Sequence, residues 1–204
     1  MKTKLFSIAL LSLLLVNCGG EEKKEETTEK DTVVAEEPKE PAYEYTYEVA
    51  EVDVPEKWAV VIGDSTTLED LKTFFPENMP KVGKTANLKP NDMAEAPMGI
   101  YYNFSPDKKF YTEAAIVITD STRKVKAPGK LKKLPAGKAV KVSFVGSYEE
   151  LEKGWNDAMA YAKEKGLEAT NVGWEQYISD PGAKDADQSK LKVDIYMGVK
   201  PAAK

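Results

Sequence analysis

The chain has 204 residues, of which 42% are hydrophobic and 31% are charged, enough for one domain with a hydrophobic core and for additional polar segments. It contains one cysteine and no histidine, which excludes an internal disulfide, a cysteine-cluster metal site and any catalysis that uses histidine. The formal net charge of −5 and the lack of a basic block argue against binding to nucleic acid, which requires clustered lysine and arginine.

Residues 1–17 have the pattern of a bacterial signal peptide. Lys2 and Lys4 precede an apolar run from Leu5 to Val16, which is shorter than the about 20 residues that span a bilayer. Asn17 and Cys18 follow the run, and this boundary resembles a lipobox, where a signal peptidase cuts before a cysteine that becomes lipid-modified. The resemblance implies an outer-membrane lipoprotein of the cell envelope, held stably by acyl chains such as palmitate. An ordinary secretory signal with an incidental cysteine is the alternative.

The segment after Cys18 is rich in charge. Residues 19–42 contain nine acidic side chains, four lysines and no aromatic residue. Because such a segment cannot bury enough apolar surface to fold, we predict a disordered tether over residues 18–42. Its acidic run resembles the surface-export signals of Bacteroidota lipoproteins, while a simple solvated spacer is the alternative. Periplasmic and surface-exposed locations both remain open.

The composition changes after residue 42, and residues 43–200 are predicted to form one folded domain. Its first half is expected to contain two strands, a helix and two further strands. The strands are indicated by alternation of apolar and polar residues and by β-branched and aromatic runs. They are expected over residues 43–49, 58–62, 98–104 and 112–119.

The helix of the first half is expected to follow a capping box formed by Thr66 and Glu69. Phe74 and Phe75 supply its apolar face. Pro76 is expected to end or bend it, because proline has no backbone N–H to donate.

The second half repeats the order strand, helix, strand, strand. Ser147 and Glu150 form a capping box for a helix that extends to Lys165, with Gly166 as its C-cap. Five side chains at helical spacing form its apolar stripe: Leu151, Trp155, Ala158, Met159 and Ala162. The strands are expected over residues 139–145, 172–178 and 191–199.

Corresponding segments of the two halves lie 80, 74 and 79 residues apart. The pairs are 67–71 with 147–151, 98–101 with 172–175, and 114–116 with 193–195. This repetition predicts tandem β-α-β-β units and an α+β fold, in which two halves related by a pseudo-twofold axis share one antiparallel sheet. The two helices are then expected to flank a central pocket, because ligand sites often form at such an interface.

Five motifs follow one another over nearly the whole domain: Met98–Tyr102, Leu134–Lys138, Phe144–Leu151, Trp174–Pro181 and Asp194–Val199. In this order they resemble the GyrI-like small-molecule-binding domain, also known as the effector-binding domain of AraC- and MerR-type transcription regulators. The resemblance implies tandem β-α-β-β units around a pocket for small aromatic, amphiphilic or cationic molecules. It also implies that Glu175, which matches the glutamate of the family's Glu-x-Tyr strand, lies in that pocket with Tyr177 close by. No helix-turn-helix precedes the domain, so direct gene regulation is not expected.

The predicted site combines one carboxylate with aromatic side chains. Glu175 and Tyr177 are two residues apart on a strand and therefore face the same side, opposite to Trp174 and Gln176. A buried glutamate without a nearby cation has a raised pKa or awaits a cationic ligand. The alternative is that Glu175 lies on a solvent-exposed face.

Two further aromatic residues are candidates for the same site. Tyr101 occupies the matching place in the first half, and Trp155 lies on the helix stripe. Plain core packing is the alternative for both residues.

Three functions remain open on this evidence. The first is an envelope sensor, scavenger or carrier that binds a small amphiphilic organic ligand and is held at the membrane by its lipid anchor. The second, which some stand-alone members of the family imply, is a hydrolase of reactive small molecules that uses Glu175 and Tyr177. The third is a protein–protein interaction module whose partner the sequence does not identify. We find no phosphate-binding loop, metal constellation or nucleophile elbow, and expect no cofactor and no metal.

Overall fold

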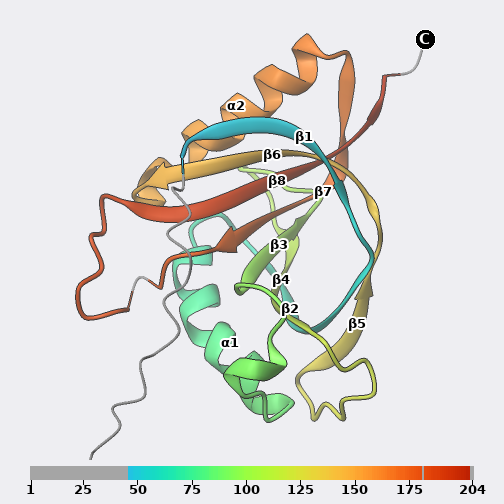
Figure 1. Ribbon diagram of the computed structural model, residues 1–204, viewed down its shortest axis with the longest axis vertical. Coiled ribbons are helices and arrows are strands. Elements are labelled where there is room, and N and C mark those ends of the chain that lie inside the picture. Colours follow the sequence, from blue (N-terminus) through green and yellow to red (C-terminus); the bar gives the residue numbers. More distant parts are fainter. Residues whose placement is uncertain (1–45, 181, 203–204) are drawn as a thin grey trace, which may run out of the picture. The chain divides into compact units, whose positions relative to one another are not determined.

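The computed structural model describes residues 46–180 and 182–202 (Figure 1). The predicted signal peptide, the lipidation of Cys18 and the predicted tether lie outside these residues. Residues Tyr43–Lys204 form one compact unit that holds every described element and all three hydrophobic clusters, so this unit has what a domain needs to fold on its own. No helix within the described ranges is long and apolar enough to cross a membrane.

The described chain contains eight strands, two α-helices and two short 3-10 helices. The strands are β1 (Glu48–Val54), β2 (Lys57–Thr66), β3 (Met98–Tyr102), β4 (Phe110–Ile118), β5 (Lys130–Leu134), β6 (Gly137–Gly146), β7 (Leu167–Tyr177) and β8 (Leu191–Pro201). The helices are α1 (Leu71–Thr85), η1 (Pro90–Asp92), η2 (Tyr148–Glu150) and α2 (Leu151–Glu164). The predicted α+β fold class is confirmed.

Two details of the strand prediction were wrong. The first strand was placed over residues 43–49, but β1 begins at Glu48 and ends at Val54, because its register is fixed by pairing with β6. The tyrosine alternation before it has the period of a strand but finds no partner strand at Tyr47, the described residue before β1. Strand β5 was not predicted.

Helix α1 continues past the proline that was expected to end or bend it. Pro76 and Pro80 both lie inside α1. Both are exposed, so the carbonyls that lose an intrahelical hydrogen bond lie on the solvent side, where they are accessible to water. Phe74 and Val82 on the opposite side are buried, and this packing holds the helix together as far as Thr85.

One of the two predicted capping boxes forms as expected. Ser147 and Glu150 make theirs at the start of η2, which leads directly into α2. The box expected between Thr66 and Glu69 does not form. The N-cap of α1 is Asp70, whose carboxylate accepts from the Thr67 hydroxyl at 2.7 Å and whose N–H donates to Thr67 Oγ1 at 3.2 Å, and its side chain caps no N–H of the helix.

The predicted stripe on α2 is correct except at one position. Ala158 and Ala162 are buried as expected, but Met159 is 51% exposed. Gly154 is buried in its place, since a Cβ atom there would lie 2.4 Å from Ile195 Cδ1 and would hold the helix away from the sheet. Gly166, with φ of 66°, follows the helix in the left-handed conformation that glycine adopts most easily.

All eight strands form one antiparallel sheet in the order β1-β6-β8-β7-β3-β4-β2-β5. The order is symmetric about the β7–β3 pair, which matches the predicted pseudo-twofold relation between β2-α1-β3-β4 and β6-α2-β7-β8. Residues 48–54 of β1 pair with β6 and residues 57–61 of β2 pair with β5 in one uninterrupted register. β1 and β2 therefore act as one long bent strand, and β5 and β6 act as another. The two bent strands pair with each other in antiparallel fashion along their length.

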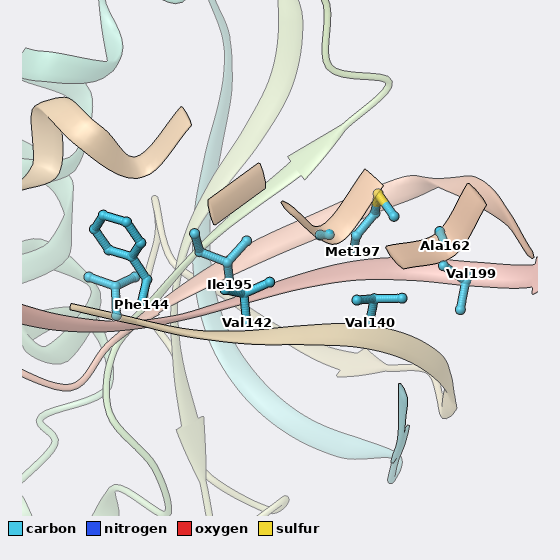
Figure 2. Packing of buried hydrophobic residues seen from close by; sticks show 9 residues of the cluster. Val140, Val142, Phe144, Ala162, Ile195, Met197 and Val199 are labelled. Carbon is cyan, nitrogen blue, oxygen red and sulfur yellow. The ribbon is translucent and has the colours of Figure 1, made fainter. Parts of the chain in front are cut away.

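Both helices pack on the same face of the sheet. One cluster lies beneath α2 (Figure 2) and contains Val140, Val142, Phe144, Ala158, Ala162, Val193, Ile195, Met197 and Val199. A second lies beneath α1 and includes Val60, Phe74, Val82 and Ile116. A third, with Met98 and Ile100 at its centre, lies on the opposite face. The helix-covered face of the central β3–β7 pair lies between the first two clusters.

Candidate functional site: a buried glutamate among aromatic rings

The central pair of strands brings the predicted site residues together. Gly99 of β3 and Glu175 of β7 are cross-strand partners, so both point to the helix-covered face. Tyr101 follows Gly99 by two residues and Tyr177 follows Glu175 by two, so both tyrosines share that face. Trp155 reaches the same place from α2.

Glu175 accepts three hydrogen bonds, and each donor is a predicted site residue. The hydroxyl of Tyr101 donates to Glu175 Oε2 at 2.7 Å and that of Tyr177 donates to the same oxygen at 3.1 Å. The indole Nε1 of Trp155 donates to Oε1 at 2.8 Å. Glu175 is 6% exposed, and none of the three donors is a cation. The structure thus places Glu175, Tyr177, Tyr101 and Trp155 in one cluster, while their role as ligand contacts stays a prediction.

More aromatic rings surround this carboxylate than the sequence predicted. Phe75 of α1 packs edge-on against Tyr101 and Tyr177, with ring centroids 5.8 and 6.1 Å apart. Tyr148 of η2 lies against Tyr177 at 5.6 Å. Phe104 and Phe110 flank Tyr101 at 6.4 Å each. The internal repeat could have identified Phe75 as a site residue. Phe75 precedes Trp155 by 80 residues, the same distance that separates the first residues of α1 and α2.

The repeat also corrects one predicted equivalence. Tyr101 was matched to Glu175, but the cross-strand partner of Glu175 is Gly99, and the counterpart of Tyr101 is Tyr177. A Cβ atom on Gly99 would lie 2.6 Å from Phe75 Cζ and 2.8 Å from the Tyr177 hydroxyl. One half of the repeat therefore supplies the carboxylate, and the other supplies the space for the rings.

The residues that alternate with the site residues on β7 point away from it. Trp174 stacks on Tyr196 on the opposite face of the sheet, with ring centroids 4.9 Å apart and planes 8° from parallel. Gln176 donates to Glu95 on that same face. The predicted division of β7 into two faces is correct.

The rings cover the carboxylate closely. Phe75, Tyr148, Trp155 and Tyr177 are each half-buried and lie above or beside Glu175, so a ligand that touches the carboxylate has to displace at least one of them. A shallow apolar depression of about 320 Å³ exists elsewhere, at the end of α2, and none of the four predicted site residues lines it. Across residues 46–180 and 182–202, no group of acidic or cysteine side chains is arranged to hold a metal ion.

Burial controls the ionisation of the site. It raises the pKa of Glu175 above its ordinary value, and the hydrogen bonds from Trp155, Tyr101 and Tyr177 offset this shift only in part. Burial and the nearby carboxylate also raise the pKa of Tyr101 and of Tyr177 well above the ordinary value, and that of Tyr148 to about 12. The tyrosines therefore remain hydrogen-bond donors at neutral pH.

The raised pKa of Glu175 predicts how stability depends on pH. Where pH lies between the ordinary carboxyl value and the raised value, the folded state holds a proton that the unfolded state has released. The free energy of unfolding therefore falls as pH rises through this window and stays lower above it. We expect Glu175→Gln to raise the free energy of unfolding at neutral pH and to remove this part of the pH dependence, as measured by urea unfolding between about pH 4 and pH 8.

Glu113→Gln is the matched control for this measurement. Glu113 is also buried, but its carboxylate is paired with Lys132 at 2.8 Å. Glutamine at this position leaves the ammonium without its partner and is expected to lower stability at neutral pH. A Glu175→Gln protein that is no more stable than the unmodified protein at any pH would contradict the raised pKa.

Comparison with known proteins identifies the family. Residues 47–200, about three quarters of the chain, match the GyrI-like small molecule binding domain. The chain belongs to the GyrI-like family. The resemblance predicted from the five motifs is thus confirmed, and small-molecule binding is the general property of this family. None of the curated proteins compared with the chain matches it.

Several solved structures share the fold at low sequence identity. The EcmrR C-terminal domain has a TM-score of 0.62 and 20% identity over 76% of this chain and 99% of that domain. SAV2435 bound to tetraphenylphosphonium has a TM-score of 0.54 and 16% identity over 76% and 94% of the two chains. A hydrolase encoded by lin2189 from Listeria innocua has a TM-score of 0.51 and 13% identity over 75% and 92%. The chain spans 58% of EcmrR in its complex with DNA.

Proposed function

We propose that the domain binds a lipophilic organic cation or a related small amphiphile at Glu175. The observation that carries this proposal is a buried carboxylate whose three hydrogen-bond donors are all neutral, inside a cluster of aromatic rings. A cation placed there neutralises the carboxylate at low dielectric and packs its apolar groups against the ring faces. Tetraphenylphosphonium, the ligand of SAV2435, has this chemistry and is a suitable first probe.

The test is a thermal-shift and calorimetric titration of the unit Tyr43–Lys204 with tetraphenylphosphonium and with the neutral analogue triphenylphosphine oxide. A ligand that binds the native state stabilises it by RT ln(1 + L/Kd), where L is the ligand concentration, so the melting temperature rises with the logarithm of that concentration once it exceeds Kd. We expect a shift with the cation and a much smaller one with the neutral compound. Equal shifts would mean that ring contacts alone select the ligand, and no shift with either would remove support from the site.

A second candidate function is hydrolysis of an electrophilic small molecule. It is favoured by the two tyrosine hydroxyls at 2.7 and 3.1 Å from a carboxylate of raised pKa, an arrangement that suits a general base with adjacent proton donors. Turnover of a strained electrophile that disappears in Glu175→Gln, while binding of a neutral analogue is retained, would favour this function over carriage or sensing.

We also propose that the protein is a lipoprotein of the cell envelope, sensing, scavenging or carrying its ligand there. The support is the apolar run that leads to the single cysteine, Cys18. In cells fed an alkyne-tagged fatty acid, the protein is expected to become labelled, and Cys18→Ala is expected to abolish both the label and membrane fractionation. Labelling that persists in Cys18→Ala would contradict the anchor.

A further inference from the structure

Basic side chains are segregated within the domain. Between Asp120 and Glu149 the chain carries eight basic residues and no acidic residue. Five of the eight have carboxylate partners: Arg123, Lys132, Lys133, Lys138 and Lys141. The other three, Lys124, Lys126 and Lys130, are exposed and have no carboxylate partner among the described residues. Lys130 is the cross-strand partner of Val61, which packs on the sheet face opposite to the helices, so the Lys130 side chain points away from α1.

The fold adds two more lysines to Lys124 and Lys126. The N–H of Lys126 donates to the carbonyl of Thr85 at 2.9 Å, which fixes the loop before β5 against the last turn of α1. Arg123 contacts Asp92 of η1 at 2.6 Å and holds the same loop against the segment after α1. Lys84 in that last turn and Lys89 just before η1 are both exposed and are thereby brought to the loop. Figure 1 shows the end of α1 and the loop into β5 in the lower part of the domain.

The resulting surface, which we call the lysine face, consists of Lys84, Lys89, Lys124 and Lys126. Asp120 at the start of the loop is the nearby carboxylate, and it accepts hydrogen bonds from the backbone and hydroxyl of Thr122. Asp92 is neutralised by Arg123. Four lysines against one carboxylate leave three net positive charges on a surface that belongs to a domain with net negative charge: 22 basic and 24 acidic side chains over residues 46–202.

We propose that the lysine face binds the anionic phospholipid headgroups of a membrane surface, independently of the Glu175 site. Lysine ammonium groups on flexible stems suit a fluid layer of phosphates, because each adds to the attraction without a fixed geometry. Duplex DNA fits less well. The arginine beside this face, the residue type best suited to bidentate contacts with a guanine edge, is already paired with Asp92.

The experiment measures partitioning of the unit Tyr43–Lys204 onto vesicles of phosphatidylcholine alone and of phosphatidylcholine with phosphatidylglycerol. The unit lacks Cys18, so a lipid anchor does not contribute. We expect binding to the anionic vesicles, little binding to the neutral ones, and loss of binding as NaCl rises from about 0.05 to 0.5 M. Lys84→Glu/Lys124→Glu/Lys126→Glu is expected to lower the partition coefficient by more than about 100-fold, since each lysine contributes roughly fivefold.

Lys72→Glu/Lys163→Glu/Lys184→Glu is the matched control. These three lysines are also exposed and without a carboxylate partner among the described residues, lie outside the lysine face, and change the net charge by the same amount. The control is expected to keep most of the binding. Equal loss in both triple variants, absence of binding to anionic vesicles, or tighter binding to a DNA duplex than to these vesicles would each overturn the proposal. Melting temperatures of both variants show whether either has unfolded.

Discussion

Replacing Glu175 by glutamine is expected to weaken the binding of tetraphenylphosphonium by roughly 30- to 5,000-fold. Removing one partner of a desolvated charge pair costs about 2–5 kcal/mol, and the other partner here is the ligand cation. Glutamine has nearly the same shape as glutamate. Its amide oxygen can accept from the indole of Trp155, and its NH2 group can donate to the hydroxyl oxygens of Tyr101 and Tyr177, so the three side chains need not move. Calorimetric titration of the unit Tyr43–Lys204 measures the change in Kd directly.

Glu113→Gln again supplies the comparison, because it removes a second buried carboxylate from the same domain. Glu113 lies on β4 with its side chain beside Tyr102 and Lys132, on the face of the sheet opposite to the helices. The affinity of the Glu113→Gln variant for the cation is expected to match that of the unmodified protein. If both variants lost affinity equally, general charge would account for binding, and Glu175 would lose its assigned role. Glu175→Gln is also expected to be more stable than the parent, which separates a binding defect from a folding defect.

The elements with strong periodicity could be predicted from the sequence. Helix α2 has a capping box, an apolar stripe and a C-terminal glycine, and all three are present in the structure. Strand β5 has the sequence KLKKL, whose three lysines give it little of the apolar pattern that predicts a strand. It forms because it pairs with β2. Lysine is common on such edge strands because it discourages further strand pairing. The bounds of β1 and the existence of β5 depend on pairing with strands that are distant in the sequence, and local periodicity does not predict such pairing.

The site was predicted to the extent that it lies within one strand or one helix. The alternation along β7 separates Glu175 and Tyr177 from Trp174, and the structure shows this separation. The role of Gly99 depends on the register between β3 and β7, which only the folded sheet defines. Phe75 was assigned to an apolar helix face, and the repeat offset shared with Trp155 is the signal that places it in the cluster.

Gly99→Ala tests whether the ring cluster needs the space that the missing side chain at Gly99 leaves. The new methyl group would lie 2.6 Å from Phe75 Cζ and 2.8 Å from the Tyr177 hydroxyl, closer than van der Waals contact allows. Overpacking of this kind costs about 1–3 kcal/mol of folding free energy. Because Phe75 and Tyr177 must move to relieve it, we expect at least a tenfold loss of cation affinity, about 1.4 kcal/mol or more, in the same variant.

Gly83→Ala provides the contrast for this prediction. Gly83 lies inside α1, and the nearest atom to a Cβ placed there is Ile116 Cδ1 at 3.9 Å, an ordinary contact. Alanine in a helix interior is favoured over glycine by about 0.5–1 kcal/mol, so this variant is expected to be more stable and to bind the cation unchanged. Urea unfolding and calorimetry of both proteins measure the two effects separately. If Gly99→Ala bound the cation as tightly as Gly83→Ala does, the contact of Phe75 and Tyr177 with the Gly99 backbone would be irrelevant to the site. The difference between glycine at position 99 and glutamate at the matching position 175 would then affect packing alone.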